Sequence, residues 1–268
     1  MLDFLVELYD QGIGYSAINT ARSALSSFLK PVNGVTFGAL PIFSRFLKGV
    51  YETRPTAPRY VETWDVGKVL GYLRTIPNST DVSFKDLTLK TVMLVSLLSA
   101  QRGQTIHSLN LEDLIQTDQS VGFSLSKPIK QSKPGITLPP LVFTSYPADP
   151  LLCVVRTLRS YIARTEAIRG QHKQLFISFV KPFHPVSRST ISRWIRLVML
   201  RSGIDVNKFK PHSTRSASTS RANQCSVPLD KILATAGWSS ATTFAKFYNK
   251  PIDVSNDYAD TILKAVQK

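Results

Sequence analysis

The sequence has little of what metal centres, disulfide frameworks and membrane spans require. Its 268 residues include two cysteines, Cys153 and Cys225, and four histidines, with no CxxC motif and no histidines at ligand spacing. These absences argue against a zinc site or a disulfide framework, and the two thiols are interpreted as free in a reducing compartment. No apolar run approaches the roughly 18 residues of a membrane span, and the N-terminus lacks the basic segment of a signal peptide. We therefore expect a protein that is neither embedded in a membrane nor secreted.

Acidic residues are scarce relative to basic ones. Lysine and arginine total 33 against 18 aspartates and glutamates, which gives a net charge of +15 and a pI near 9.9. This balance favours a polyanionic partner, most often nucleic acid, although net charge also serves solubility. Apolar residues make up 43% of the chain, which is enough for a folded core.

The first part of the chain has the pattern of a small helical unit. Apolar residues at helical spacing predict three short helices: one near the N-terminus, one capped by Ser16, and one over residues 42–50. Residues 52–59 contain two prolines and two arginines without periodicity, which is typical of a linker. We assign residues 1–55 to the helical unit and residues 56–64 to the linker.

The remainder, residues 65–268, has the pattern of a mainly helical domain with a small β-hairpin, an α+β fold. The predicted helices cover residues 65–73, 87–100, 149–168, 187–203, 212–223, 228–236, 241–248 and 254–266. The predicted strands cover residues 121–125, 136–138 and 175–178. Asp149-Pro150 is expected to start its helix, because aspartate caps and proline suits the first turn.

Two arginines are placed where a phosphodiester could be held. Attack on a phosphodiester builds negative charge on its non-bridging oxygens, and a guanidinium donates two parallel hydrogen bonds and stays charged. Arg102 directly follows an apolar helix, a position where a charged residue is unexpected unless it has a function. Arg215 lies three residues after His212, so both project from one helical face. Taken singly, either arginine would be interpreted as a solvated surface charge.

A histidine, an indole and a phenol complete the candidate site. His212 can donate to a phosphate oxygen or transfer a proton. Trp238 offers one N–H donor, and a role in the core is its alternative interpretation. Tyr248, ten residues after Trp238, is the candidate nucleophile. A phenol ionises only near pH 10, so it needs nearby positive charge or a base. Tyr258 is the nearby competitor and is interpreted as structural.

These residues carry a family resemblance because they follow one another in a specific order: Arg102, His212, Arg215, Gly237, Trp238 and Tyr248. The order resembles the tyrosine recombinases, the phage-type integrases. In that family a lysine in a strand–turn–strand hairpin protonates the departing 5′ oxygen. The predicted turn over 126–135 offers Lys127, Lys130 and Lys133. Lys130, near its centre, is the first candidate and Lys127 the second.

The resemblance implies the fold, the reaction and the partners. Residues 65–268 would form a tyrosine recombinase catalytic domain, and residues 1–55 a partial, SAM-like core-binding domain. Tyr248 would form a 3′-phosphotyrosyl link with double-stranded DNA, with no metal, nucleotide or other cofactor. The chain would act as a homo-oligomer, a synaptic tetramer on DNA.

A narrower resemblance concerns the lineage. The motif from Ser16 to Leu25 and the stretch from Phe46 to Arg54 resemble recombinases of eukaryotic mobile elements, the DIRS and Crypton kind. A nuclear location follows if the source is eukaryotic, and a cytoplasmic one otherwise.

Two features depart from the family pattern. Relatives often have an acid where Thr105 stands, and the N-terminal part is short. An alternative function is therefore an inert or domesticated DNA-binding module derived from a mobile element. A further alternative is a relaxing activity like that of type IB topoisomerases, which shares the chemistry without synapsis.

Overall fold

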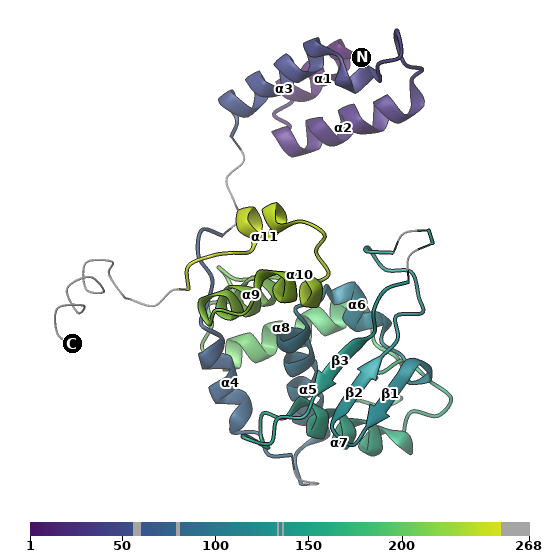
Figure 1. The fold of residues 1–268 in the computed structure, drawn as a ribbon, viewed down its shortest axis with the longest axis vertical. Coiled ribbons are helices and arrows are strands. Elements are labelled where there is room, and N and C mark those ends of the chain that lie inside the picture. Colours follow the sequence, from purple (N-terminus) through teal and green to yellow (C-terminus); the bar gives the residue numbers. More distant parts are fainter. Residues whose placement is uncertain (56–59, 79–80, 133, 136, 253–268) are drawn as a thin grey trace, which may run out of the picture. The chain divides into compact units, whose positions relative to one another are not determined.

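The structure is a computed structural model that describes residues 1–55, 60–78, 81–132, 134–135 and 137–252. The chain divides into two compact units, Met1–Arg59 and Tyr60–Lys268, each described by itself (Figure 1). The described residues are mainly helical with one small antiparallel sheet, which confirms the α+β class predicted from the sequence.

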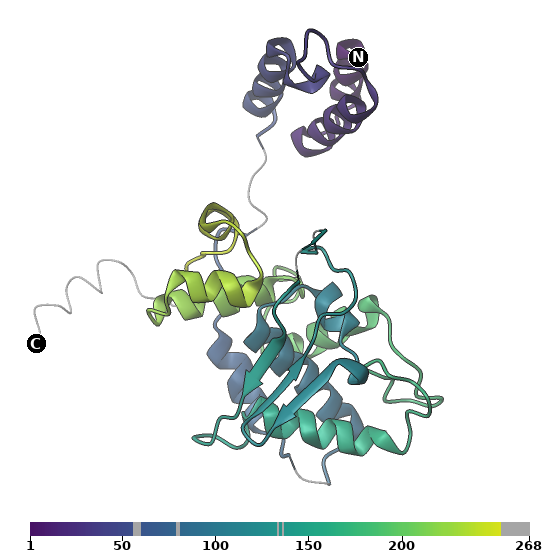
Figure 2. The same cartoon turned by 45° about the vertical axis from the view of Figure 1, so that its right-hand side comes forward.

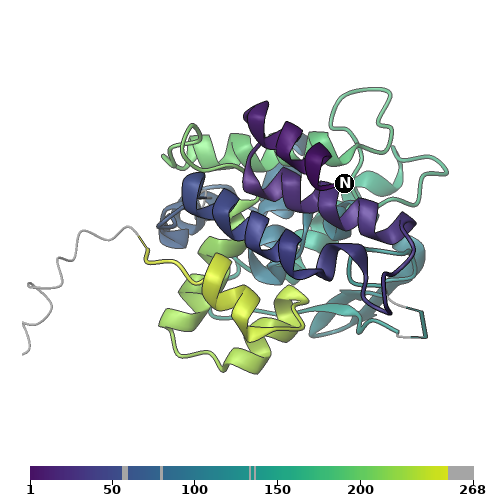
Figure 3. The ribbon, with the colours of Figure 1, turned by 90° about the horizontal axis from the view of Figure 1, so that it is seen from above.

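Unit 1 consists of three helices around a small apolar core. The helices are α1 (Leu2–Asp10), α2 (Tyr15–Phe28) and α3 (Pro41–Thr53), with a 3-10 turn at Phe37–Ala39 (Figure 3). The buried core residues come from all three helices: Leu5, Ile18, Phe43, Leu47 and Val50. The prediction that Ser16 caps the second helix was wrong, because α2 begins at Tyr15 and Gly14 is its N-cap.

Unit 2 is built around α5 (Phe84–Ser99), which is buried on nearly every side. Its almost continuous apolar sequence suits that position. Helices α7 (Val154–Glu166), α8 (Arg188–Arg201) and α9 (Ser213–Gln224) pack around it (Figure 2). The start predicted at Leu87 was three residues late, because Ser83 caps the helix by accepting the Asp86 N–H.

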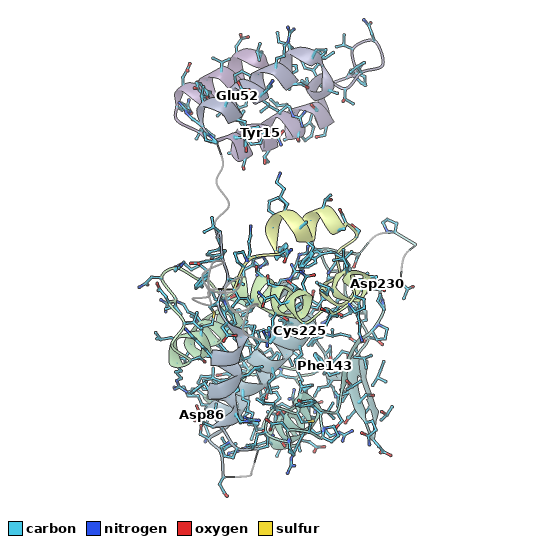
Figure 4. All side chains as sticks on the ribbon, turned by 60° about the vertical axis from the view of Figure 1, so that its left-hand side comes forward. Tyr15, Glu52, Asp86, Phe143, Cys225 and Asp230 are labelled. Atoms are coloured by element: carbon cyan, nitrogen blue, oxygen red, sulfur yellow. The ribbon has the colours of Figure 1, made fainter. Side chains whose placement is uncertain are left out.

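An ion pair joins the first turn of α5 to the last turn of α8. Asp86, which is labelled in Figure 4, has its Oδ1 2.8 Å from Arg201 Nη1. The Ser83 hydroxyl donates to the Asp86 carboxylate, and this bond together with Arg201 lowers the pKa of Asp86. The pair adds a polar contact to the packing of α8 against α5.

The sheet has three antiparallel strands in the order β1-β2-β3. These are β1 (Leu114–Thr117), β2 (Ser120–Phe123) and β3 (Leu141–Thr144), with Val121 opposite Phe143. The sequence predicted β2 but missed β1. It also placed the strand that follows the lysine-rich turn at 136–138, whereas the strand that pairs with β2 on that side is β3. The lysine-rich segment therefore lies in the long connection between β2 and β3, residues 124–140.

Two further sequence predictions differ from the structure, and one cannot be compared. α7 begins at Val154, and Asp149 instead accepts the Leu151 N–H in a turn. Residues 175–178 form no strand, because among them Ile177 alone takes part in an isolated bridge, with Pro185. The predicted helix over 254–266 lies outside the described residues.

Shorter helices complete unit 2. These are α4 (Val66–Arg74), capped by Asp65, α6 (Gly103–Ser108), α10 (Leu229–Ala236) and α11 (Ala241–Phe247). α10 and α11 lie side by side in Figures 1 and 3, and a separate apolar cluster joins them. Its buried members are Ala100, Ile232, Ala236, Trp238 and Phe244.

The first residues of unit 2 touch the segments that carry the candidate site. The buried Trp64 indole donates to the Ser213 hydroxyl at 2.8 Å. The Thr63 N–H donates to the Pro251 carbonyl at 2.8 Å, and Thr63 forms a parallel bridge with Ile252. The end of the predicted linker thus packs within unit 2.

The described residues form neither a candidate membrane span nor a candidate metal centre. None of the described helices is both long and apolar enough to cross a membrane. The described histidines, cysteines and acids form no group of three or more that could hold a metal ion.

Candidate active site

Arg215 is the buried centre of the site. It lies on α9 with 1% of its surface exposed. Its Nε donates to the Ala100 carbonyl at 2.6 Å and its Nη2 to the Ala236 carbonyl at 2.8 Å, while the buried Nη1 has no hydrogen-bond partner. The pKa of Arg215 is lowered to about 10, chiefly by burial, with Tyr248 opposing the shift and the nearby Arg102 adding to it. An arginine held this way by neutral carbonyls keeps one N–H edge for an anion.

Arg102 presents a second guanidinium to the same place. The chain leaves α5 through Ala100, whose backbone is left-handed with φ of 50°, and Arg102 then forms the N-cap of α6. Arg102 Nη1 is buried and has no hydrogen-bond partner. Both arginines line a cavity of about 420 Å³. A phosphate group in this cavity could accept hydrogen bonds from the unpartnered donors of both cations.

His212 and Tyr248 meet at the mouth of this cavity. His212 Nε2 lies 3.2 Å from the Tyr248 hydroxyl oxygen, and both residues line the cavity. The Arg215 guanidinium lies 5.2 Å from the centre of the Tyr248 ring. Residues 36 positions apart in the sequence therefore share a hydrogen bond. The phenol has both a proton acceptor and a cation within reach, which is what its activation requires.

Trp238 lies behind the phenol. Its ring centre is 4.3 Å from that of Tyr248 and 4.9 Å from the Arg215 guanidinium. It is 8% exposed, and its buried Nε1–H has no hydrogen-bond partner. Trp238 lines a neighbouring cavity of about 670 Å³ that shares Arg102 with the first. The indole thus combines the packing role and the available donor that the sequence left as alternatives.

The structure separates the candidate lysines. Lys130 is exposed and lines both cavities, together with Arg102. Lys127 is exposed and lines neither of them. Lys133 lies outside the described residues. Of the two described lysines, Lys130 is the one that faces the arginines and the phenol.

A pair of amide side chains anchors the lysine segment, and sequence reasoning missed both. Gln131 Nε2 donates to Gln101 Oε1 at 3.2 Å and to the Gly237 carbonyl at 3.3 Å, while Gln101 Nε2 donates to the Thr235 carbonyl at 2.7 Å. The network joins the β2–β3 connection, the end of α5 and the end of α10. Only adjacency to Arg102 and Lys130 could have signalled these residues.

α8 contributes a further cation. Arg188, its first residue, lines the 420 Å³ cavity together with Ser192. No motif in the sequence distinguishes Arg188 from the other arginines of this helix, Arg193, Arg196 and Arg201. Its position at the helix start, one turn before Ser192, is what brings it to the cavity.

Unit 2 combines a buried central helix, a three-stranded antiparallel sheet and a site of cations around one phenol, the architecture of a tyrosine recombinase catalytic domain. A family model described as the phage integrase family matches residues 72–253. The chain therefore belongs to the phage integrase family, the tyrosine recombinases. Among curated proteins, none matches the chain in sequence.

Solved structures share the fold at low sequence identity. XerH site-specific recombinase, in a post-cleavage complex with its palindromic difH substrate, has a TM-score of 0.63 and 13% identity over 99% of this chain and 70% of its own. The Tn1549 transposon integrase with transposon right end DNA has a TM-score of 0.63 and 13% identity over 99% and 83%. A lambda integrase dimer bound to a COC′ core site has a TM-score of 0.51 and 17% identity over 96% and 65%.

Proposed function

We propose that this chain is a site-specific DNA recombinase that cleaves and rejoins double-stranded DNA through a 3′-phosphotyrosyl intermediate. Membership of the phage integrase family supports the reaction class. The observation that carries the residue assignment is the Tyr248 hydroxyl, 3.2 Å from His212 Nε2 on a cavity lined by Arg102 and Arg215. The net charge of +15 suits a DNA partner.

The cleavage step follows from this arrangement. The Tyr248 oxygen attacks the phosphorus, and its proton passes to His212. A bond forms between the Tyr248 oxygen and phosphorus while the bond from phosphorus to the 5′ oxygen breaks. Arg102 and Arg215 stabilise the added charge on the non-bridging oxygens through donors that are already in place. Lys130 gives a proton to the departing 5′ oxygen. Rejoining is the reverse, with a 5′ hydroxyl of a second DNA end as the attacking group.

Assembly and lineage are extensions of this proposal. Unit 1 would act as a partial core-binding domain that holds DNA, and the active form would be a tetramer that pairs two DNA sites. Other family structures contain DNA-bound assemblies, such as the lambda integrase dimer. The motifs at 16–25 and 46–54 favour descent from a eukaryotic mobile element, which would place the protein in a nucleus.

Replacing Tyr248 with phenylalanine tests the nucleophile. Tyr248→Phe removes the attacking oxygen but keeps the ring that packs on Trp238. We expect the covalent DNA adduct to vanish on a denaturing gel with a nicked suicide substrate, while the DNA dissociation constant stays within about threefold. Tyr258→Phe, the nearby tyrosine in the sequence, should leave the adduct intact.

Other outcomes of this assay would contradict the proposal. An adduct in Tyr248→Phe would overturn the choice of nucleophile. Binding without an adduct in the unmodified chain would instead indicate an inert DNA-binding module. Relaxation of supercoiled plasmid by the monomer would indicate a topoisomerase-like activity.

A further inference from the structure

Two serine hydroxyls of α9 bind the backbone of the candidate nucleophile. Ser216 Oγ donates to the Tyr248 carbonyl oxygen at 2.9 Å, and Ser220 Oγ donates to the same oxygen at 2.7 Å. Both serines are buried, Ser220 completely. A carbonyl oxygen has two lone pairs, so the two hydroxyls satisfy its full capacity.

These serines use their hydroxyls differently from a neighbour on the same helix. Helical serines and threonines often donate to the carbonyl one turn earlier, and Thr219 does so with Arg215 at 2.7 Å. Ser216 and Ser220 are four residues apart, so they share a helix face and reach out to another segment. Ser220 Oγ also accepts the Lys250 N–H at 3.0 Å. The serines therefore hold the chain on both sides of Asn249.

One helix thus carries the guanidinium and holds the backbone of the phenol. Arg215 immediately precedes Ser216 on α9. With the Tyr248 carbonyl fixed to that helix, the phenol ring lies 5.2 Å from the guanidinium of the same chain.

We propose that Ser216 and Ser220 are positioning residues, which register the Tyr248 backbone against α9 and so hold the phenol beside the Arg215 guanidinium. The inference rests on the proposed function and deepens it. Both serines act through the backbone of Tyr248 and not on the phosphate, so their loss should slow the attack and leave DNA affinity unchanged.

The test compares the rate of adduct formation by serine variants on the suicide substrate at saturating DNA. A misplacement of about 1 Å can cost roughly 100-fold in rate, so we expect Ser216→Ala with Ser220→Ala to slow adduct formation by roughly 10- to 100-fold. The DNA dissociation constant should stay within about twofold. Ser218→Ala is the matched control, because Ser218 donates to the Leu97 carbonyl on the opposite side of the same helix. It should leave the rate of adduct formation unchanged.

The outcomes separate this inference from the proposed function. An adduct in the unmodified chain, with serine variants as fast as Ser218→Ala, would overturn the positioning role alone. No adduct in the unmodified chain would overturn both. If the double variant fails to fold, by circular dichroism, the single variant Ser216→Ala carries the same comparison.

Discussion

At the scale of single residues, the site depends on cations held without acidic partners. Arg215 is 1% exposed, yet its Nε and Nη2 donate to backbone carbonyls. Burial of a charge costs stability unless hydrogen bonds compensate it, and here they do so only in part, because Nη1 has no partner. That cost is consistent with a site whose missing partner is the DNA phosphate.

Lys90 gives a prediction at the same scale, away from the site. It is fully buried in α5 and donates to the Ile76 carbonyl, and burial lowers its pKa from 10.5 to about 8. The unfolded chain then binds more protons between these two values, so this residue makes stability rise as pH increases from about 8 to 10.5.

We therefore expect Lys90→Met to raise the melting temperature at pH 7. The gain should shrink as the pH rises to 10, by an amount that corresponds to at most roughly 3 kcal/mol. Thermal unfolding of both proteins at several pH values measures the difference. A gain that stays constant with pH would show that the charge of Lys90 does not oppose folding.

The candidate residues could be proposed from the sequence because their order is specific. The residues that hold them in place could not. Ser216 and Ser220 are ordinary helix residues by composition, and only the return of the chain at Tyr248 gives them partners. Gln131 likewise gains its role from contacts with residues 30 and 106 positions away. Spacing along the chain carries no information about such contacts.

At the scale of elements, local signals located some boundaries and tertiary contacts set the others. Asp65 and Ser187 cap helices where the sequence predicted them, because capping is decided within one turn. The Asp149-Pro150 signal failed because Asp149 forms a turn and an ion pair with Arg74. The mostly exposed strand β1 was missed because its apolar alternation is weak.

The end of α10 gives a prediction at this scale. Gly237 has a φ of 65°, and a Cβ there would overlap Gln131 Nε2 and lie 3.1 Å from Gln131 Cδ. Gly237→Ala should cost about 1–2 kcal/mol for the left-handed backbone and also displace the segment that carries Lys130. We expect a lower melting temperature and slower adduct formation.

Gly203→Ala is the matched control for that variant. Gly203 has a φ of 76°, but a Cβ there would meet nothing within 4 Å. It should lower the melting temperature by a similar backbone cost and leave the adduct rate unchanged. Equal adduct rates in the two variants would show that Gln131 does not set the position of Lys130.

At the scale of the whole molecule, the two units differ in the size of their cores and in the candidate site residues that they contain. The large core and all the described site residues belong to unit 2, whereas unit 1 has a small core of its own and exposed Lys30, Arg45 and Lys48. Contacts with phosphates release counterions, so affinity falls with salt in proportion to their number.

We expect residues 60–268 alone to unfold cooperatively in circular dichroism but to bind duplex DNA more weakly than the full chain. The plot of log affinity against log salt should be shallower, by about 0.9 for each phosphate that unit 1 contacts. Fluorescence anisotropy between 50 and 200 mM salt measures both slopes. Identical slopes would mean that unit 1 touches no phosphate.

The hydrogen bond between Thr63 and Pro251 has a mechanical consequence. Thr63 is among the first residues of unit 2, and Pro251 is three residues beyond Tyr248. Tension applied to the chain ahead of Thr63 would therefore reach the segment that carries the candidate nucleophile through this backbone hydrogen bond and a few peptide units.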